Sequence, residues 1–178
     1  MSASGATGPR PATRSGTGQI LVFVALFAGV LVVLLAAVIS EGSIDADYGQ
    51  VRDAANTAAL VGAREVLLGR DDASVTQAMA TALRAQGTFA SVTVTATAPP
   101  AQAAPMTLWV QARYLNSAGQ PSTYVSQGLP SGGASGVRVD GATLFAQPLL
   151  GAMLGRPSVV LSASALARRG PPPHLEAP

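Results

Sequence analysis

The sequence contains no cysteine and no lysine, and its one histidine is His174. Without cysteine there is no disulfide framework, no thiolate metal site and no cysteine nucleophile. A Walker-type phosphate loop needs lysine and is therefore excluded. A lone histidine within a proline-rich stretch leaves neither a zinc ligand set nor the usual general base. We therefore expect no enzyme, no catalytic residue, no metal site and no cofactor.

Charged and aromatic residues are also scarce. Charged side chains make up 11% of the 178 residues and aromatic side chains 4%, whereas about a quarter of an average globular sequence is charged. The eleven basic residues, all arginine, exceed the acids by only two and form no basic stripe. A nucleic-acid partner would require such a stripe, so none is expected, and no small-molecule substrate is indicated.

One long hydrophobic run dominates what is present. Residues 20–39, from Ile20 to Ile39, contain no polar side chain, and fifteen of these 20 residues are Leu, Ile, Val or Phe. As a helix the run is about 30 Å long, which matches the hydrocarbon core of a bilayer. We predict a transmembrane helix over 19–40 with the lipid bilayer as its partner. A buried core helix and a signal peptide cleaved after Ser40 are the alternatives.

The flanks of the run predict its orientation. Arg10 and Arg14 precede it, and the next basic residue is Arg52. The positive-inside rule then places the N-terminus in the cytoplasm and the C-terminal domain outside the membrane, with a single pass. Residues 1–18 and 170–178 are polar, proline-containing stretches, which we expect to be a disordered cytoplasmic arm and a disordered tail.

Residues 41–87 have the pattern of an extracytoplasmic helical region. We predict a nearly continuous helix from about 19 to 69, with a bend near Ser40 and Gly42, and a second helix over 73–86 that Asp71 or Asp72 caps. Very small side chains at four-residue spacing form one face of the first helix, and such a face lets another helix approach closely. These helix-packing residues are Ala54, Ala55, Ala58, Ala59, Gly62 and Ala63.

After Gly87 the period of the pattern changes to two. Alternation predicts strands over 91–97, 107–114, 122–126, 137–139 and 158–167. Residues 143–154 read instead as an apolar helical piece. The expected fold class is therefore α+β: a long N-terminal membrane-spanning helix extended by an Ala-rich helix, followed by a small antiparallel sheet over 88–169.

Two stretches resemble a known family. GQILVFVALFAGVLVVLLAAVI followed by DYGQVRDAANTAALVGA is similar to the N-terminal region of TadE/TadG-like proteins of the Tad (Flp) pilus system, and 142–167 is similar to the family's C-terminal run. The resemblance implies a pilin-like component of the bacterial cytoplasmic membrane, whose partners are other pilus or pseudopilin subunits and the assembly machinery. The length points to a minor pseudopilin or assembly factor that acts by helix packing.

The chain departs from the family pattern at two places. Asn56 stands where the family usually has aspartate. Pilin-type precursors are cut after a glycine before the apolar helix, which makes Gly18 and Gln19 the candidate processing site, but the fifth residue would then be Phe23 rather than glutamate. An anchored or secreted binding or adhesive module with no pilus role is the alternative function, and an extracytoplasmic enzyme is the third.

Overall fold

A computed structural model describes residues 17–98, 104–128, 133–146, 155 and 158–169. The chain forms two compact units, residues 1–38 and 39–178. The expected arm over 1–18 lies outside the described residues except for Thr17 and Gly18, which are helical. The expected tail over 170–178 lies outside them entirely.

Helix α1 (Thr17–Leu67) begins in the first unit and ends in the second. It continues through Ser40 and Gly42, where the sequence predicts a bend, and the Ser43 hydroxyl donates to the Ser40 carbonyl at 2.8 Å. Gly69 follows with a φ of 68°. A glycine in this left-handed conformation ends a helix without steric cost, so the end falls close to the predicted one.

Helix α2 (Asp72–Ala85) confirms the second predicted helix. Its cap is Asp71, whose carboxylate accepts a hydrogen bond from the Ser74 amide at 3.1 Å. This bond satisfies one of the amides that the first turn leaves without a helical partner. The buried side chains of α2 are spaced as one helical face: Val75, Met79, Ala80 and Leu83.

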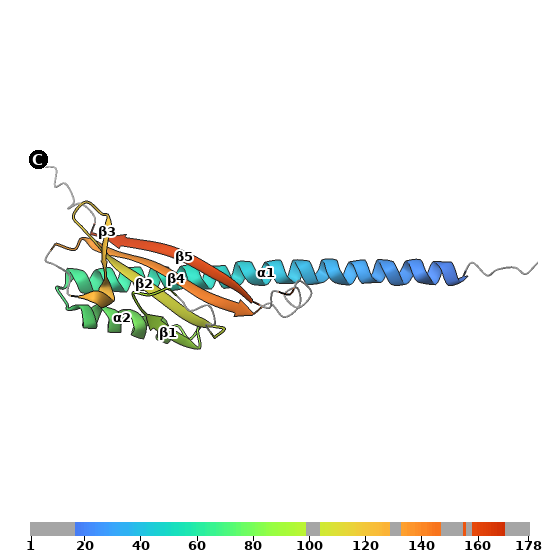
Figure 1. Cartoon of the computed structure of the whole chain (residues 1–178), viewed down its shortest axis with the longest axis horizontal. Helices are drawn as coiled ribbons and strands as arrows, with labels where there is room; N and C mark the ends of the chain where they lie inside the picture. The colour runs from blue at the N-terminus through green and yellow to red at the C-terminus, as the bar shows by residue number, and fades with distance from the viewer. Residues whose placement is uncertain (1–16, 99–103, 129–132, 147–154, 156–157, 170–178) are drawn as a thin grey trace, which may run out of the picture. The chain divides into compact units, whose positions relative to one another are not determined.

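The second unit contains a five-stranded mixed sheet (Figure 1). Its strands are β1 (Ser91–Val94), β2 (Thr107–Leu115), β3 (Pro121–Tyr124), β4 (Gly136–Ala146) and β5 (Ser158–Arg168), and the 3-10 helix η1 (Val125–Gln127) follows β3. The order is β1-β2-β4-β5, and β3 pairs antiparallel with β2.

The prediction of an antiparallel sheet was wrong for β1, because β1 pairs parallel to β2. Parallel neighbours need a connection long enough to carry the chain back to the same end of the sheet, about a dozen residues or more. The stretch between Val94 and Thr107 is that long. The alternating pattern of each strand gives its faces but does not give the direction of its neighbour.

The predictions over 137–154 also need correction. The brief strand at 137–139 is the long strand β4, so residues 143–146 are extended rather than helical, and 147–154 lie outside the described residues. Strand β4 pairs with β5 along its whole length, from Gly136 opposite Arg168 to Ala146 opposite Ser158. This pairing supplies the backbone hydrogen bonds that override the helical preference of the short apolar run.

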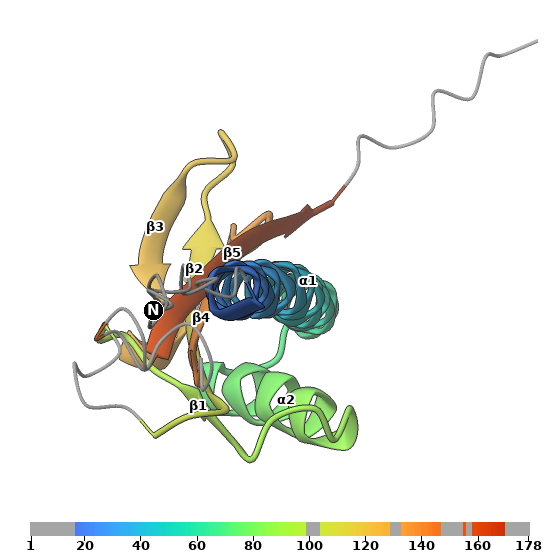
Figure 2. The same ribbon diagram turned by 90° about the vertical axis from the view of Figure 1, so that its right-hand side faces the viewer.

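The core of the second unit lies between the sheet and the two helices. Figure 2 shows α1 and α2 on one side of the sheet. The alternation that predicts a strand over 107–114 corresponds to burial on one face of β2, since Leu108, Val110, Ala112 and Tyr114 are all buried. Strand β4 adds Val137, Val139 and Phe145 to the same cluster. This core fixes both helices against the sheet and thereby forms the grooves described below.

Candidate functional site

The apolar segment of α1, residues 20–39, is exposed on every side. All fifteen of its Leu, Ile, Val and Phe side chains are exposed, with relative accessibilities from 43% for Leu31 to 70% for Leu21. An 18-residue window in this helix has a mean hydropathy of 3.2 and none of it is buried. Such a helix is stable in lipid or among similar helices but not in water.

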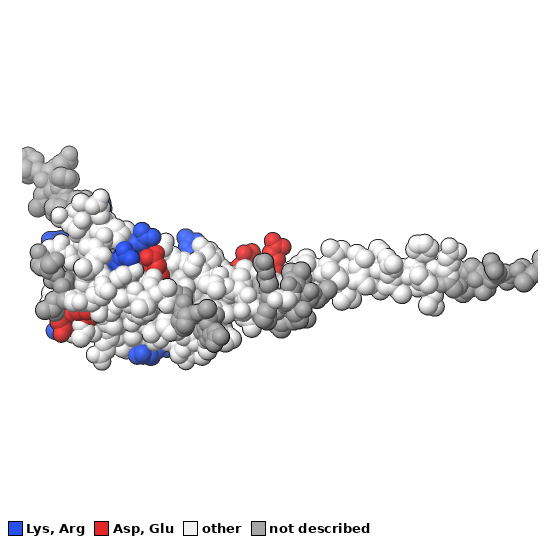
Figure 3. Space-filling model, viewed as in Figure 1, with Lys and Arg blue, Asp and Glu red and all other residues white. Residues whose placement is uncertain are grey.

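Charge is absent from the same segment. The visible surface of the apolar segment carries neither basic nor acidic atoms, whereas the second unit shows both (Figure 3). A helix of this length with no ionisable side chain has no electrostatic cost of entering a hydrocarbon layer. Length, composition and exposure therefore all agree with a membrane-spanning segment between Ile20 and Ile39.

The predicted helix-packing residues come together in the second unit, and the same chain covers them. Ala54, Ala55, Ala58 and Ala59 have accessibilities of 0 to 1%, Ala63 is 6% exposed, and Gly62 is buried. A Cβ on Gly62 would lie 2.9 Å from the Met79 sulfur of α2. The small side chains let α1 pack closely on the chain's own sheet and second helix. A helix of another subunit is not needed to explain them.

The candidate processing residues lie in the first turn of α1. Gly18 and Gln19 follow Thr17, where the helix begins, and the Gln19 side chain is exposed. The backbone here is helical in the structure, so a peptidase would have to unwind the first turn to reach the bond after Gly18.

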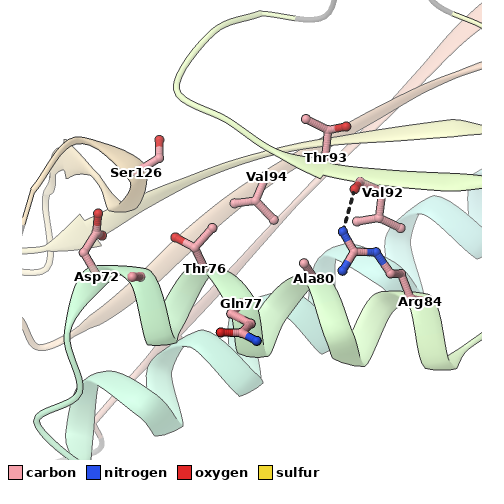
Figure 4. A pocket seen from close by; sticks show the side chains of 10 residues that line it. Asp72, Thr76, Gln77, Ala80, Arg84, Val92, Thr93, Val94 and Ser126 are labelled. Atoms are coloured by element: carbon pink, nitrogen blue, oxygen red, sulfur yellow. Dashed lines mark hydrogen bonds between the residues drawn. The ribbon is translucent and has the colours of Figure 1, made fainter.

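A groove with a volume of about 690 Å³ lies between α2 and β1. Side chains at four-residue spacing form its helical wall, and strand β1 forms the other wall (Figure 4). Val92 and Val94 point toward α2, whereas Thr93 points away. The lining residues are Asp72, Ala73, Thr76, Gln77, Ala80, Arg84, Val92, Thr93, Val94 and Ser126.

The two ends of this groove carry opposite charges. At one end the Arg84 guanidinium donates to the Val92 carbonyl at 3.5 Å. At the other end the Tyr114 hydroxyl donates to the Asp72 carboxylate at 2.7 Å. Partial burial raises the pKa of Asp72 above its ordinary value although the Tyr114 bond opposes the shift, and burial together with Asp72 raises the pKa of Tyr114. At neutral pH the groove runs from a carboxylate to a guanidinium.

The outer face of the sheet carries a second polar surface. The Arg113 guanidinium lies over the Tyr124 ring, 4.1 Å from its centre, and hydrogen-bonds its hydroxyl. Arg138 pairs with Asp140 at 3.2 Å, and both side chains remain about two-fifths exposed. These contacts satisfy one another, and an exposed ion pair of this kind contributes about 0–1 kcal/mol.

Sequence reasoning missed the groove. The sequence predicts Asp72 only as a possible cap and gives Arg84 no role. The one available signal was the spacing of residues 72, 76, 80 and 84, which places them on one helical face. Nothing in that spacing shows that β1 lies opposite.

Comparison with known proteins found no matching family model, no matching curated protein and no matching solved structure. The function is therefore inferred from the residues and their geometry.

Proposed function

We propose that the protein is a non-enzymatic, single-pass membrane component of a Tad/Flp-type pilus, a TadE/TadG-like minor pseudopilin or assembly factor. The observation that carries the proposal is the exposure of all fifteen Leu, Ile, Val and Phe side chains over residues 20–39. A soluble protein would have to cover them, because burying each such side chain is worth about 1.5–3 kcal/mol. A pilin-like subunit keeps them in lipid first and then among the helices of its neighbours.

The orientation follows from the arginines. Arg10 and Arg14 lie before the apolar segment, and the first basic residue after it is Arg52. The N-terminus is then cytoplasmic in a bacterial inner membrane, and residues 39–178 form an extracytoplasmic domain.

The subunit-packing surface is the apolar segment itself. The Ala-rich face farther along α1 is occupied by the chain's own sheet and second helix, so it has little area left to offer a neighbour. Within the apolar segment, a Cβ added to Gly29 would meet no described atom within 4 Å, and Ala25 and Ala28 lie beside it on the helix. We place the contact between subunits on this part of the helix.

The absence of cysteine makes topology directly testable. Single-cysteine variants Ser15→Cys and Ser117→Cys place one thiol on each side of the proposed span. In cells whose outer membrane alone is permeabilised, a membrane-impermeant maleimide should label Ser117→Cys. It should label Ser15→Cys only after detergent lysis. Labelling in the opposite order would overturn the orientation, and recovery of either variant in the soluble fraction would overturn the anchor.

Subunit packing needs a separate measurement. Cysteines introduced one at a time over residues 25–33 should crosslink between copies or to other pilus subunits with a helical period of about 3.6 residues. Deletion of the gene should also reduce surface pili. Normal piliation together with uniform absence of crosslinks would contradict the pilus role.

An anchored extracytoplasmic binding module is the second candidate, and the α2–β1 groove favours it. N-terminal sequencing of the mature protein separates the possibilities. A start at Gln19 indicates pilin-type processing, a start at Glu41 indicates secretion, and an intact N-terminus indicates a static anchor.

A further inference from the structure

Strand β1 presents an open backbone edge to the groove. The Thr95 amide donates to the Val110 carbonyl of β2 at 2.8 Å, whereas the Val92 carbonyl accepts from Arg84. Successive residues of a strand direct their backbone groups to opposite sides. Thr93 and Thr95 therefore face β2, and Val92 and Val94 face away. Among the described strands only β2 pairs with β1, so the backbone groups of Val92 and Val94 lie along an edge without a neighbouring strand, where Arg84 holds the Val92 carbonyl through one hydrogen bond.

The wall opposite this edge has the length and shape for an extended chain. The lining residues of α2 run from Asp72 to Arg84, which at about 1.5 Å per residue is roughly 18 Å. An extended segment of about five residues spans that distance. Between the ends, two of the side chains on the helical wall are short, the half-buried Thr76 and the buried Ala80, and the exposed Gln77 lies beside them. The short side chains leave space along this part of the wall for side chains of an added strand.

The end charges favour one direction for the added strand. The Arg84–Val92 hydrogen bond places the start of β1 beside Arg84, and Figure 4 shows Val94 farther toward the Asp72 end. A segment with a carboxylate beside Arg84 and a cationic amino end beside Asp72 therefore runs antiparallel to β1. The guanidinium has five donors, so Arg84 can hold the Val92 carbonyl and a carboxylate together.

We propose that the α2–β1 groove binds an extended peptide segment of a partner protein, which adds as an antiparallel strand to β1 with its basic end at Asp72 and its acidic end at Arg84. Strand addition of this kind gains affinity from backbone hydrogen bonds and specificity from alternate side chains. The inference goes beyond the proposed pilus role, because an anchored module of any function would carry the same groove.

The test uses the full chain in detergent micelles and dye-labelled peptides in a fluorescence-anisotropy titration. The probe alternates valine and threonine over six residues, with arginine at its amino end and glutamate at its carboxyl end. One control peptide exchanges the arginine and the glutamate, and another carries N-methyl groups on the amides that would pair with β1. We expect the probe to bind about tenfold more tightly than either control, which corresponds to about 1.4 kcal/mol.

Two protein variants test the edge and the charge separately. Val94→Pro removes one outward amide, whereas the matched Val94→Thr retains it, so only the proline variant should lose affinity. Arg84→Glu makes both ends of the groove acidic, so it should abolish the preference for the probe over its charge-exchanged control. Arg64→Glu, at an exposed position on α1 outside the groove, should leave the preference unchanged. Absence of binding by the probe, or equal binding of the N-methylated peptide, would overturn the proposal. An unchanged preference in Arg84→Glu would overturn the assigned direction. Piliation tests the proposed pilus role and peptide binding tests the groove, so one proposal can be refuted while the other stands.

Discussion

Two glycines of β4 should respond in opposite ways to alanine. A Cβ on Gly136 would lie 2.1 Å from the Ala167 carbonyl oxygen and 2.6 Å from the Arg168 Cα, both on the backbone of β5. A Cβ on Gly141 would meet its nearest atoms, which include the Ala55 Cβ, at 3.8 Å. The first position has no space for a methyl group, and the second offers an ordinary van der Waals contact.

The expected changes in the free energy of unfolding follow from whether the substitution displaces β5. Gly136→Ala forces the end of β5 away from β4, which releases the pairs Gly136–Arg168 and Val137–Ala167. Each backbone hydrogen bond lost costs about 1 kcal/mol of folding free energy, and overpacking that is not relieved by the displacement costs about 1–3 kcal/mol. Gly136→Ala should therefore lower the free energy of unfolding by about 2–3 kcal/mol. Gly141→Ala costs no such displacement and restricts the unfolded chain, so it should stabilise the fold by about 0.4–1 kcal/mol.

Thermal unfolding in detergent micelles measures both effects. Trp109 is the only tryptophan in the chain and lies opposite Ala142 of β4, so its fluorescence reports on the sheet and is silent about the apolar segment. At about 3–4 °C per kcal/mol for a unit of this size, Gly136→Ala should lower the melting temperature by about 6–12 °C. Gly141→Ala should raise it by about 1–4 °C. Shifts of equal sign and size would refute the steric argument.

Four further substitutions have defined outcomes. Tyr114→Phe leaves the partly buried Asp72 carboxylate without its donor and should destabilise the second unit by about 1–3 kcal/mol at pH 7, as chemical denaturation would show. Burial raises the pKa of Asp72 above 3.8, so the carboxyl group binds its proton more tightly in the folded chain than in the unfolded chain. The ionised Asp72 therefore lowers the free energy of unfolding at neutral pH. This loss disappears as the pH falls through the raised pKa toward 3.8. Asp72→Asn should then be neutral or stabilising at pH 7, with an advantage that shrinks in acid, and an advantage that grew in acid would contradict the sign. Gly62→Leu drives a side chain into Met79, 2.9 Å from the Cβ position, and should lower the stability of the second unit by about 1–3 kcal/mol while membrane insertion, measured by carbonate extraction, stays unchanged. Leu31→Arg should raise the free energy of insertion by about 3–4 kcal/mol relative to Leu31→Ile, and an equal inserted fraction for the two in a glycosylation-mapping assay would count against a membrane span.

The elements that the sequence predicted well are those set by local chemistry. The apolar run over 20–39 has one stable form away from water, which is a helix, and no contact elsewhere in the chain is needed to decide it. The cap at Asp71 or Asp72, the end of the first helix near residue 69 and the alternating burial along β2 likewise follow from side-chain type and spacing.

The predictions that were wrong concern features that depend on residues far away in the sequence. Residues 143–146 contain an apolar run that suits a helix, and pairing with β5 makes them a strand. The direction of β1 depends on how the chain returns over the stretch before Thr107, which alternation does not encode. In both cases backbone hydrogen bonds between residues far apart in sequence outweigh local preference.

The sequence by itself therefore determined the apolar helix over 20–39 and the helical or strand character of most segments, because hydrophobic patterning and capping act within a few residues. Only the tertiary structure decided what covers the small face of α1 and which strands are neighbours. It also decided that β1 and α2 enclose a groove between Asp72 and Arg84. A groove forms where two elements lie opposite each other, and its width depends on the packing of the core beneath both of them.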